Sequence, residues 1–178
     1  MVQSTGTILG RSTRKVLIIG LLYSAIALCL CILHPDLSGI AMYPGAGIRN
    51  RMLYPFFHAS LLHVIMNCWC LLSIVFIYKV SAWTLLEAYL IAVTYPSGLL
   101  SFLYPASQMT VGLSGVCYYL LGSLSFSVKR RVYWQVCICI TLLAGFLFPR
   151  SVDCWLHLYC YIWGIIAACV NKLNEKPC

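Results

Sequence analysis

The sequence predicts an all-α membrane protein of six transmembrane helices. Two observations predict this class. Of the 178 residues, 62% are hydrophobic and only 9% are charged, whereas a soluble domain carries about 25% charged residues. Apolar runs of about 17 to 25 residues, long enough to cross a bilayer, alternate with short segments that contain charge, Pro or Gly. We therefore expect a single membrane domain over residues 1–178.

The apolar runs place the six spans at residues 16–33, 61–78, 82–104, 113–128, 133–148 and 155–170. The first run follows a basic segment, as a secretory signal does, but it is long for a signal and no small-residue cleavage pattern follows it. We expect it to be the first spanning helix. The stretch 34–60 combines three prolines with glycines and aromatic residues, which predicts a structured outer loop in the membrane interface.

Basic residues give the expected orientation. One set of loop ends holds Arg11, Arg14, Lys15, Lys79, Lys129, Arg130, Arg131, Lys172 and Lys176, and the other holds Arg49, Arg51 and Arg150. Cytoplasmic loops carry the excess of Lys and Arg, so residues 1–15 and 171–178 are predicted to be cytoplasmic. These helix flanks account for the net charge of +8, and we expect the lipid bilayer, and no nucleic acid, as a partner.

Eleven cysteines lie in the chain, most of them along the apolar runs and without the spacing of zinc ligands. We expect them to be small buried hydrophobic side chains. No metal site is expected.

Reactive polar side chains converge at one depth. Depth can be estimated by counting residues from the basic residue at the predicted cytoplasmic end of each span. Ser114 is 15 residues from Lys129, and His157 is 15 residues from Lys172. His63 and Asn67 are 16 and 12 residues from Lys79. At 1.5 Å per residue they lie roughly 18 to 24 Å from that boundary, hence some 6 to 12 Å below the outer surface of a core of about 30 Å. Polar groups at this depth are costly and predict a functional site.

The fourth span is short, so the chain before Ser114 must descend to it in non-helical form. Irregular backbone at membrane depth is tolerated where it is buried in protein or lines a watery cavity. We therefore expect a cavity that opens outward.

Ser114 is the candidate nucleophile. A serine hydroxyl attacks a carbonyl when a neighbouring base takes its proton, although a serine at the start of a helix can instead be an N-cap.

His157 is the candidate base, the alternative being a histidine bonded to a backbone carbonyl. Small residues after His157 (Cys160, Gly164 and Ala168), together with Gly115 and Gly122 in the fourth span, permit a close helix approach. Tyr118, one turn after Ser114, could then pack beneath the imidazole.

No carboxylate is predicted at this depth, because Asp36 and Asp153 fall in outer loops, Glu87 near the inner end of the third span and Glu175 in the tail. A catalytic unit would be a Ser–His dyad without an acid.

His63 and Asn67, four residues apart on one helical face, could stabilise an oxyanion with the Ser114 N–H. They could equally form an interhelical hydrogen-bonded pair, and depth alone does not choose His157 over His63 as the base.

At these residues the chain resembles the rhomboid family of intramembrane serine proteases. The matching positions are His58, His63 and Asn67 at the second span, Gly112, Ser114, Gly115, Tyr118 and Gly122 at the fourth, and His157 in the sixth. The resemblance implies a six-helix rhomboid-like bundle. The chain departs from the family pattern at Cys160, where a glycine is usual, at Leu156, where a small residue is usual, and at Asn50-Arg51, where the loop usually has Trp-Arg.

The resemblance implies that Ser114 attacks the scissile carbonyl and that His157 acts as general base and then as general acid. The backbone from Gly112 to Ser114, with His63 and Asn67, would line the oxyanion pocket. His58, Gly115, Tyr118 and Gly164 would be structural supports. The substrate would be a transmembrane segment of another membrane protein, and no cofactor is needed.

Two other functions are open at this point. One is an inactive rhomboid-like protein that binds transmembrane clients, but such a protein would normally lack one residue of the dyad. The other is a small multi-pass transporter, which would predict paired carboxylates or inverted repeats; the sequence has neither. We expect residence in a bacterial plasma membrane.

Overall fold

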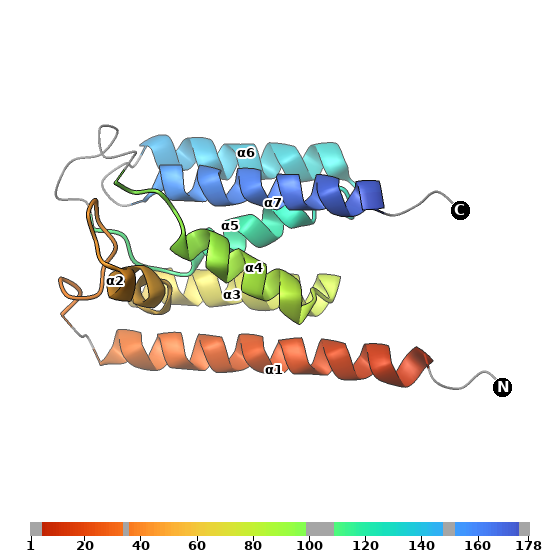
Figure 1. Cartoon of the computed structure of the whole chain (residues 1–178), viewed down its shortest axis with the longest axis horizontal. Helices are drawn as coiled ribbons and strands as arrows, with labels where there is room; N and C mark the ends of the chain where they lie inside the picture. Colours follow the sequence, from red (N-terminus) through yellow and green to blue (C-terminus); the bar gives the residue numbers. More distant parts are fainter. Residues whose placement is uncertain (1–4, 34–35, 99–108, 148–151, 175–178) are drawn as a thin grey trace.

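The computed structural model describes residues 5–33, 36–98, 109–147 and 152–174. The regular elements within these ranges are helices: α1 (Thr5–Ile32), α2 (Ile48–Leu53), a 3₁₀ turn η1 (Tyr54–Phe56), α3 (Leu61–Tyr78), α4 (Ala82–Val93), α5 (Ser114–Ser123), α6 (Arg131–Leu147) and α7 (Cys154–Asn174). The longer helices run along one axis, and α1 begins at the end of the bundle where α7 finishes (Figure 1). The turns around α2 lie at the opposite end.

A helix occurs at each of the six predicted spans, and α3 coincides with the prediction of 61–78. Among the described residues, three helical segments are long and apolar enough to cross a membrane: Arg14–Ile32, Leu61–Tyr78 and Cys154–Asn174. The helices α4 and α6 are apolar but shorter, and α5 has 10 residues. The prediction of a helical membrane protein is confirmed, whereas six crossings and the cytoplasmic side of the termini stay predictions.

Two helices end earlier than the sequence predicts. The span expected at 82–104 is helical only to Val93, because Pro96 disfavours helical backbone at the residue before it; residues 99–104 lie outside the described part. The span expected at 113–128 ends at Ser123, where the Ser123 hydroxyl donates to the Leu120 carbonyl at 2.8 Å. The first helix instead begins earlier than expected, at Thr5, because basic residues end an apolar run without ending a helix.

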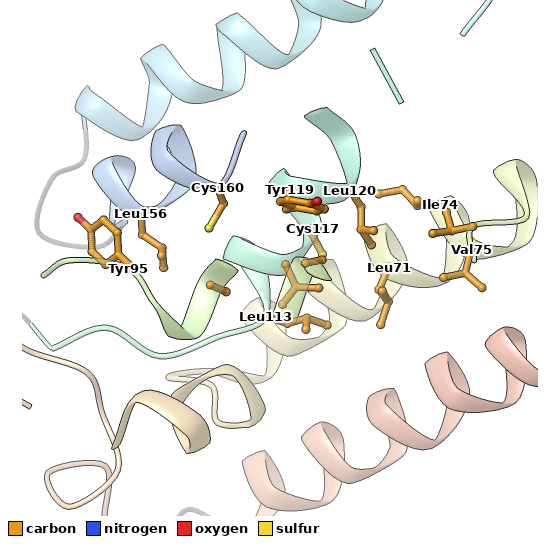
Figure 2. Packing of buried hydrophobic residues seen from close by; sticks show 14 of the residues in the cluster. Leu71, Ile74, Val75, Tyr95, Leu113, Cys117, Tyr119, Leu120, Leu156 and Cys160 are labelled. Carbon is orange, nitrogen blue, oxygen red and sulfur yellow. The ribbon is translucent and has the colours of Figure 1, made fainter. Parts of the chain in front are cut away.

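The short helix α5 is the centre of the bundle and packs against α3, α4 and α7. Figure 2 shows Cys117, Tyr119 and Leu120 of α5 between side chains of α3 and α7. The neighbours in this cluster include Leu71, Ile74 and Val75 from α3 and Leu156 and Cys160 from α7. The depth at which α5 begins therefore fixes where Ser114 lies in the protein.

The closest contact between α5 and α7 is made by two glycines. A Cβ atom added to Gly122 would fall on the Tyr161 carbonyl oxygen and lie 3.1 Å from the Gly164 Cα, and one added to Gly164 would fall on the Tyr119 carbonyl oxygen. Backbone therefore contacts backbone at this crossing, as the small residues in both spans predict. This contact sets the distance between Ser114 and His157, which lie two turns away on their helices.

The loop of residues 36–60 is tied to the helices by polar contacts. The Arg51 guanidinium donates to the carbonyls of Ala46 (3.3 Å) and Tyr95 (2.5 Å) and to the Ser97 hydroxyl (3.1 Å). The Asn50 amide donates to the Ala41 carbonyl at 2.8 Å. The departure at Asn50-Arg51 therefore leaves the loop with an anchoring arginine, and the loop is structured as expected.

Candidate active site

The chain enters the site through irregular backbone just before α5. Residues 109–113 are not helical, and Thr110 pairs with Met42 through two backbone hydrogen bonds of 2.8 and 2.9 Å. The Gly112 N–H donates to the Tyr54 carbonyl at 3.0 Å. Gly112 has a φ of +119°, which favours glycine over any residue with a side chain. The non-helical approach to Ser114 is present as predicted, while residues 99–108 lie outside the described part.

The Ser114 hydroxyl oxygen lies 2.7 Å from Nε2 of His157. Ser114 is the first residue of α5, and Leu113 occupies the N-cap position without a side-chain hydrogen bond, so the N-cap alternative for Ser114 is wrong. His157 lies in the first turn of α7 and is buried. Its imidazole stacks on the Tyr118 ring, with centroids 4.3 Å apart and an interplanar angle of 18°. The tyrosine ring limits the imidazole to an orientation that faces the serine.

His63 and Asn67 of α3 lie next to Gly112, in the segment that precedes Ser114. A Cβ atom on Gly112 would be 2.7 Å from Cε1 of His63 and 3.3 Å from Nδ2 of Asn67. Gly112 is therefore required both by its φ and by the space these side chains occupy. Nδ2 of Asn67 is buried and has no hydrogen-bond partner among the described residues. A buried amide donor without an acceptor is costly and is suited to bind an oxygen of a ligand.

His58 supports the turn before α5. It is buried, and its Nε2 accepts the Leu113 N–H at 3.3 Å. Its ring meets the His63 ring edge-on, with centroids 5.0 Å apart. Burial, with a smaller contribution from His63, lowers the pKa of His58 to about 4. The imidazole is therefore neutral at pH 7, which leaves Nε2 free to accept the hydrogen bond.

These groups border one cavity of about 760 Å³. Its wall includes Ser114, His157, His63 and Asn67, and α6 closes it on one side through Thr141, Ala144 and Gly145. The volume lies in the range of about 300 to 1,000 Å³ that is usual for ligand sites. A cavity at the start of α5 agrees with the expectation from the irregular backbone, whereas its opening toward the outer face stays a prediction.

Asp153 is a buried site residue that the sequence predicted in an outer loop. Its Oδ1 accepts the Leu156 N–H at 2.9 Å, and its Oδ2 accepts the Thr110 hydroxyl at 2.7 Å. It therefore begins α7 one turn before His157 and joins that helix to the chain entering Ser114. An Asp immediately before an apolar helix is the signal of an N-cap, and it could have indicated this position.

The other carboxylates lie elsewhere, as far as the structure describes them. Asp36 accepts the Ser38 hydroxyl and backbone N–H in the outer loop, and Glu87 accepts the Tyr119 hydroxyl at 3.2 Å. Glu175 lies outside the described residues.

Leu156 and Cys160, which depart from the family pattern, pack on Gly115. A Cβ atom on Gly115 would be 3.4 Å from the Leu156 methyl groups and 3.3 Å from the Cys160 sulfur. Both side chains are fully buried. The larger residues on α7 thus fill the space that the glycine on α5 leaves open, and Ser114 and His157 remain within hydrogen-bonding distance.

The helical membrane fold and this site define an intramembrane protein with a serine and a histidine in a cavity. Comparison with known families identifies the family to which the chain belongs. The model of the Rhomboid domain matches residues 48–172. The chain belongs to the rhomboid family, whose members are generally serine proteases that act on membrane proteins within the bilayer. The matched range runs from the start of α2 into the last turn of α7, while α1 precedes it. No curated protein matches the chain.

Proposed function

We propose that the protein is an intramembrane serine endopeptidase that cleaves transmembrane segments of other membrane proteins with the dyad of Ser114 and His157. The observation that carries this proposal is the 2.7 Å contact between Ser114 Oγ and His157 Nε2 at the wall of the 760 Å³ cavity. Membership in the rhomboid family supports it independently.

In the first half of the reaction, Ser114 Oγ attacks the scissile carbonyl carbon while His157 Nε2 takes the hydroxyl proton. The tetrahedral intermediate then breaks its C–N bond, and His157 gives that proton to the leaving amine. An acyl-enzyme ester on Ser114 remains. In the second half, His157 takes a proton from water as the water attacks the ester, then returns it to Ser114 Oγ as the acid product leaves.

The oxygen of the tetrahedral intermediate carries negative charge that needs hydrogen-bond donors. The Asn67 amide borders the cavity and has no partner among the described residues, and the first N–H groups of α5 have no acceptor within their helix. His63, held next to Gly112, is a third donor. Each such donor typically contributes a few kcal/mol to lowering the barrier. His63 is thus assigned to the oxyanion, and His157 to the base.

The proposal includes the arrangement in the membrane. The bundle crosses the bilayer six times with both termini in the cytoplasm, and the cavity opens toward the outer face of a bacterial plasma membrane. Cations at the ends of the spans favour this orientation. A substrate helix presents its scissile bond near its outer end, where local unwinding exposes the peptide carbonyl.

The test is cleavage of a single-pass model substrate by the purified protein in proteoliposomes. We expect cleavage by the intact chain and none above background with Ser114→Ala or His157→Ala. A fluorophosphonate probe should label the intact protein and leave Ser114→Ala unlabelled. A thermal unfolding curve for each variant separates loss of chemistry from loss of fold.

Cleavage that survives either substitution would remove the dyad assignment. Binding of the substrate without cleavage or probe labelling by the folded intact chain would instead identify an inactive relative that holds transmembrane clients.

A further inference from the structure

A second hollow lies away from the Ser114 cavity, between the first half of α6 and the last turns of α7. Its volume is about 470 Å³, and it is lined by Ser125 and Phe126 before α6, by Arg131, Val132, Gln135, Val136, Cys139 and Ile140 of α6, and by Lys172 of α7. These parts of α6 and α7 lie toward the end of the bundle where α7 finishes (Figure 1). The mechanism proposed above uses none of these residues.

The hollow has two cations at one end. Arg131 is the first residue of α6, and Lys172 lies in the last turn of α7. The Lys172 ammonium lies 5.3 Å from the centroid of the Phe126 ring, a cation–π contact that holds it at the rim. None of the described lining residues is acidic, and Lys129 and Arg130 add further positive charge next to Arg131. This end is therefore complementary to an anion.

The rest of the hollow is mostly apolar, with Ser125 and Gln135 as its polar residues. Val132, Val136 and Ile140 recur at the spacing of one helical face and are 79%, 49% and 59% exposed. Ile140 lies nine residues after Arg131, about 13 Å along the helix axis. The groove thus has a cationic head and an apolar trough that runs toward the middle of the bundle, which is the shape of a lipid with a charged headgroup.

We propose that this groove binds one anionic phospholipid. The lipid phosphate lies between Arg131 and Lys172, and an acyl chain lies along Val132, Val136 and Ile140. In the orientation proposed above, on which this inference rests, this end of the bundle faces the cytoplasm, and basic pockets between helices at that surface bind such headgroups. The lipid bridges α6 and α7.

This bridge has a consequence for the cavity. The helix α6 packs mainly against α7, and its other half contributes Thr141, Ala144 and Gly145 to the cavity wall. A lipid bound at the Arg131 end steadies the helix that closes the cavity on one side.

The test is native mass spectrometry of the full chain in detergent, titrated with phosphatidylglycerol or with phosphatidylcholine of the same acyl chains. We expect one tightly retained phosphatidylglycerol and weaker phosphatidylcholine. Arg131→Gln and Lys172→Gln should each lower the phosphatidylglycerol affinity about five-fold. Lys15→Gln is the matched control, since it removes the same charge from α1, on the far side of the bundle from α6 (Figure 1), and should leave the affinity unchanged.

A second set of measurements distinguishes binding of the whole lipid from binding of its headgroup alone. Glycerol 3-phosphate should not displace the lipid at equal concentration, and Val136→Phe, which fills the trough, should weaken binding with both cations intact. Equal retention of the two lipids, an equal loss with Lys15→Gln, or full displacement by glycerol 3-phosphate would overturn the proposal. The readout is binding, so Ser114→Ala protein serves equally well and the result does not depend on protease activity. Thermal unfolding of each variant confirms that it is folded.

Discussion

At the scale of single residues, the amide of Asn67 combines burial with an unused donor. Nδ2 has no partner among the described residues, yet it lies beside the backbone that leads to Ser114. A purely structural asparagine would be expected to satisfy its donor, because an unpaired buried donor costs about 1–3 kcal/mol. The arrangement is understandable if an oxygen of the substrate completes the hydrogen bond during the reaction.

We predict that Asn67→Leu, which keeps the volume but removes the donors, lowers kcat about a hundredfold with little change in KM. The thermal unfolding temperature should be unchanged or higher, because the donor has no partner in the resting protein. Proteoliposome kinetics and thermal unfolding give the two readouts. The opposite pattern, a lower unfolding temperature with normal kcat, would mean that Asn67 ties helices together.

Asp153 shows how one residue can position two segments. Its carboxylate accepts one hydrogen bond from the start of α7 and another from Thr110. His157 is four residues later on α7, and Ser114 is four residues after Thr110. The carboxylate therefore connects the two segments of the chain that carry the proposed dyad.

We predict that Asp153→Ala lowers the free energy of unfolding by about 1–3 kcal/mol, because it removes an N-cap and a second buried hydrogen bond. Thr110→Val removes only one of these bonds and should cost about 1 kcal/mol. Both are measured by unfolding in a mild detergent. Asp36→Ala is the control, since Asp36 is exposed and its hydrogen bonds within the described residues go to its near neighbour Ser38; an equal loss there would contradict the assignment.

At the scale of elements, the short helix α5 positions Ser114 and the candidate site around it. It starts at Ser114 and is buried by α3, α4 and α7, and irregular chain fills the space before it. Because its N-terminus lies inside the protein, the N–H groups of its first turn and the Ser114 hydroxyl face the cavity. The glycine contact between α5 and α7 then holds the imidazole opposite.

We predict that Gly122→Ala destabilises the protein by about 1–3 kcal/mol or more, because the added methyl group would meet the backbone of α7 and backbone cannot move aside cheaply. Proteolytic activity should fall as well, since separation of α5 and α7 moves His157 away from Ser114. Chemical unfolding and substrate cleavage are the measurements.

The matched control is Gly20→Ala in α1, where the added Cβ would lie 3.5 Å from Leu72. This is an ordinary contact, and alanine favours a helix over glycine by about 1 kcal/mol. Stability equal to or above that of the unsubstituted protein is expected. Equal tolerance of both substitutions would exclude the close crossing of α5 and α7.

At the scale of the whole molecule, the apolar outer surface and the charged ends describe a protein that lies across a bilayer. Large hydrophobic side chains of α1, α3, α6 and α7 are exposed, as expected where lipid covers the protein. The first residues of α1 and the last of α7 lie at one end, and the loop with α2 lies at the other (Figure 1). An even number of crossings would put both termini on the same side.

We predict that a reporter active only in the cytoplasm works when fused at residue 1 or residue 178 and fails when inserted at Gly45, in the loop at the opposite end of the bundle. The physical reason is the excess of Lys and Arg at the ends of the spans near the termini. Labelling of a single engineered cysteine at Gly45 by a membrane-impermeant reagent is an independent measurement. A terminus on the same side as Gly45 would contradict the six-crossing topology.

Much of this organisation could be predicted from local sequence. Apolar runs determine the helices because burial in lipid depends on composition, and α3 begins and ends where its run does. Helix ends inside the bundle were less predictable. A hydrophobic stretch continues past Val93 and past Ser123, yet α4 ends before Pro96 and α5 ends at Ser123. Apolar composition does not encode such helix ends.

The sequence by itself determined the membrane class and the approximate positions of the longer helices. It also predicted that Ser114, His157, His63 and Asn67 lie at one depth, because the rise of a helix is fixed per residue. Only the tertiary structure decided that Ser114 bonds His157, 43 residues away, and that His63 lies beside Gly112 instead. It also decided that Asp153 is buried. Such pairings depend on how separate helices are rotated and spaced relative to one another. Contacts between helices, such as that of Gly122 with Gly164, set this arrangement, and the sequence of a single segment does not.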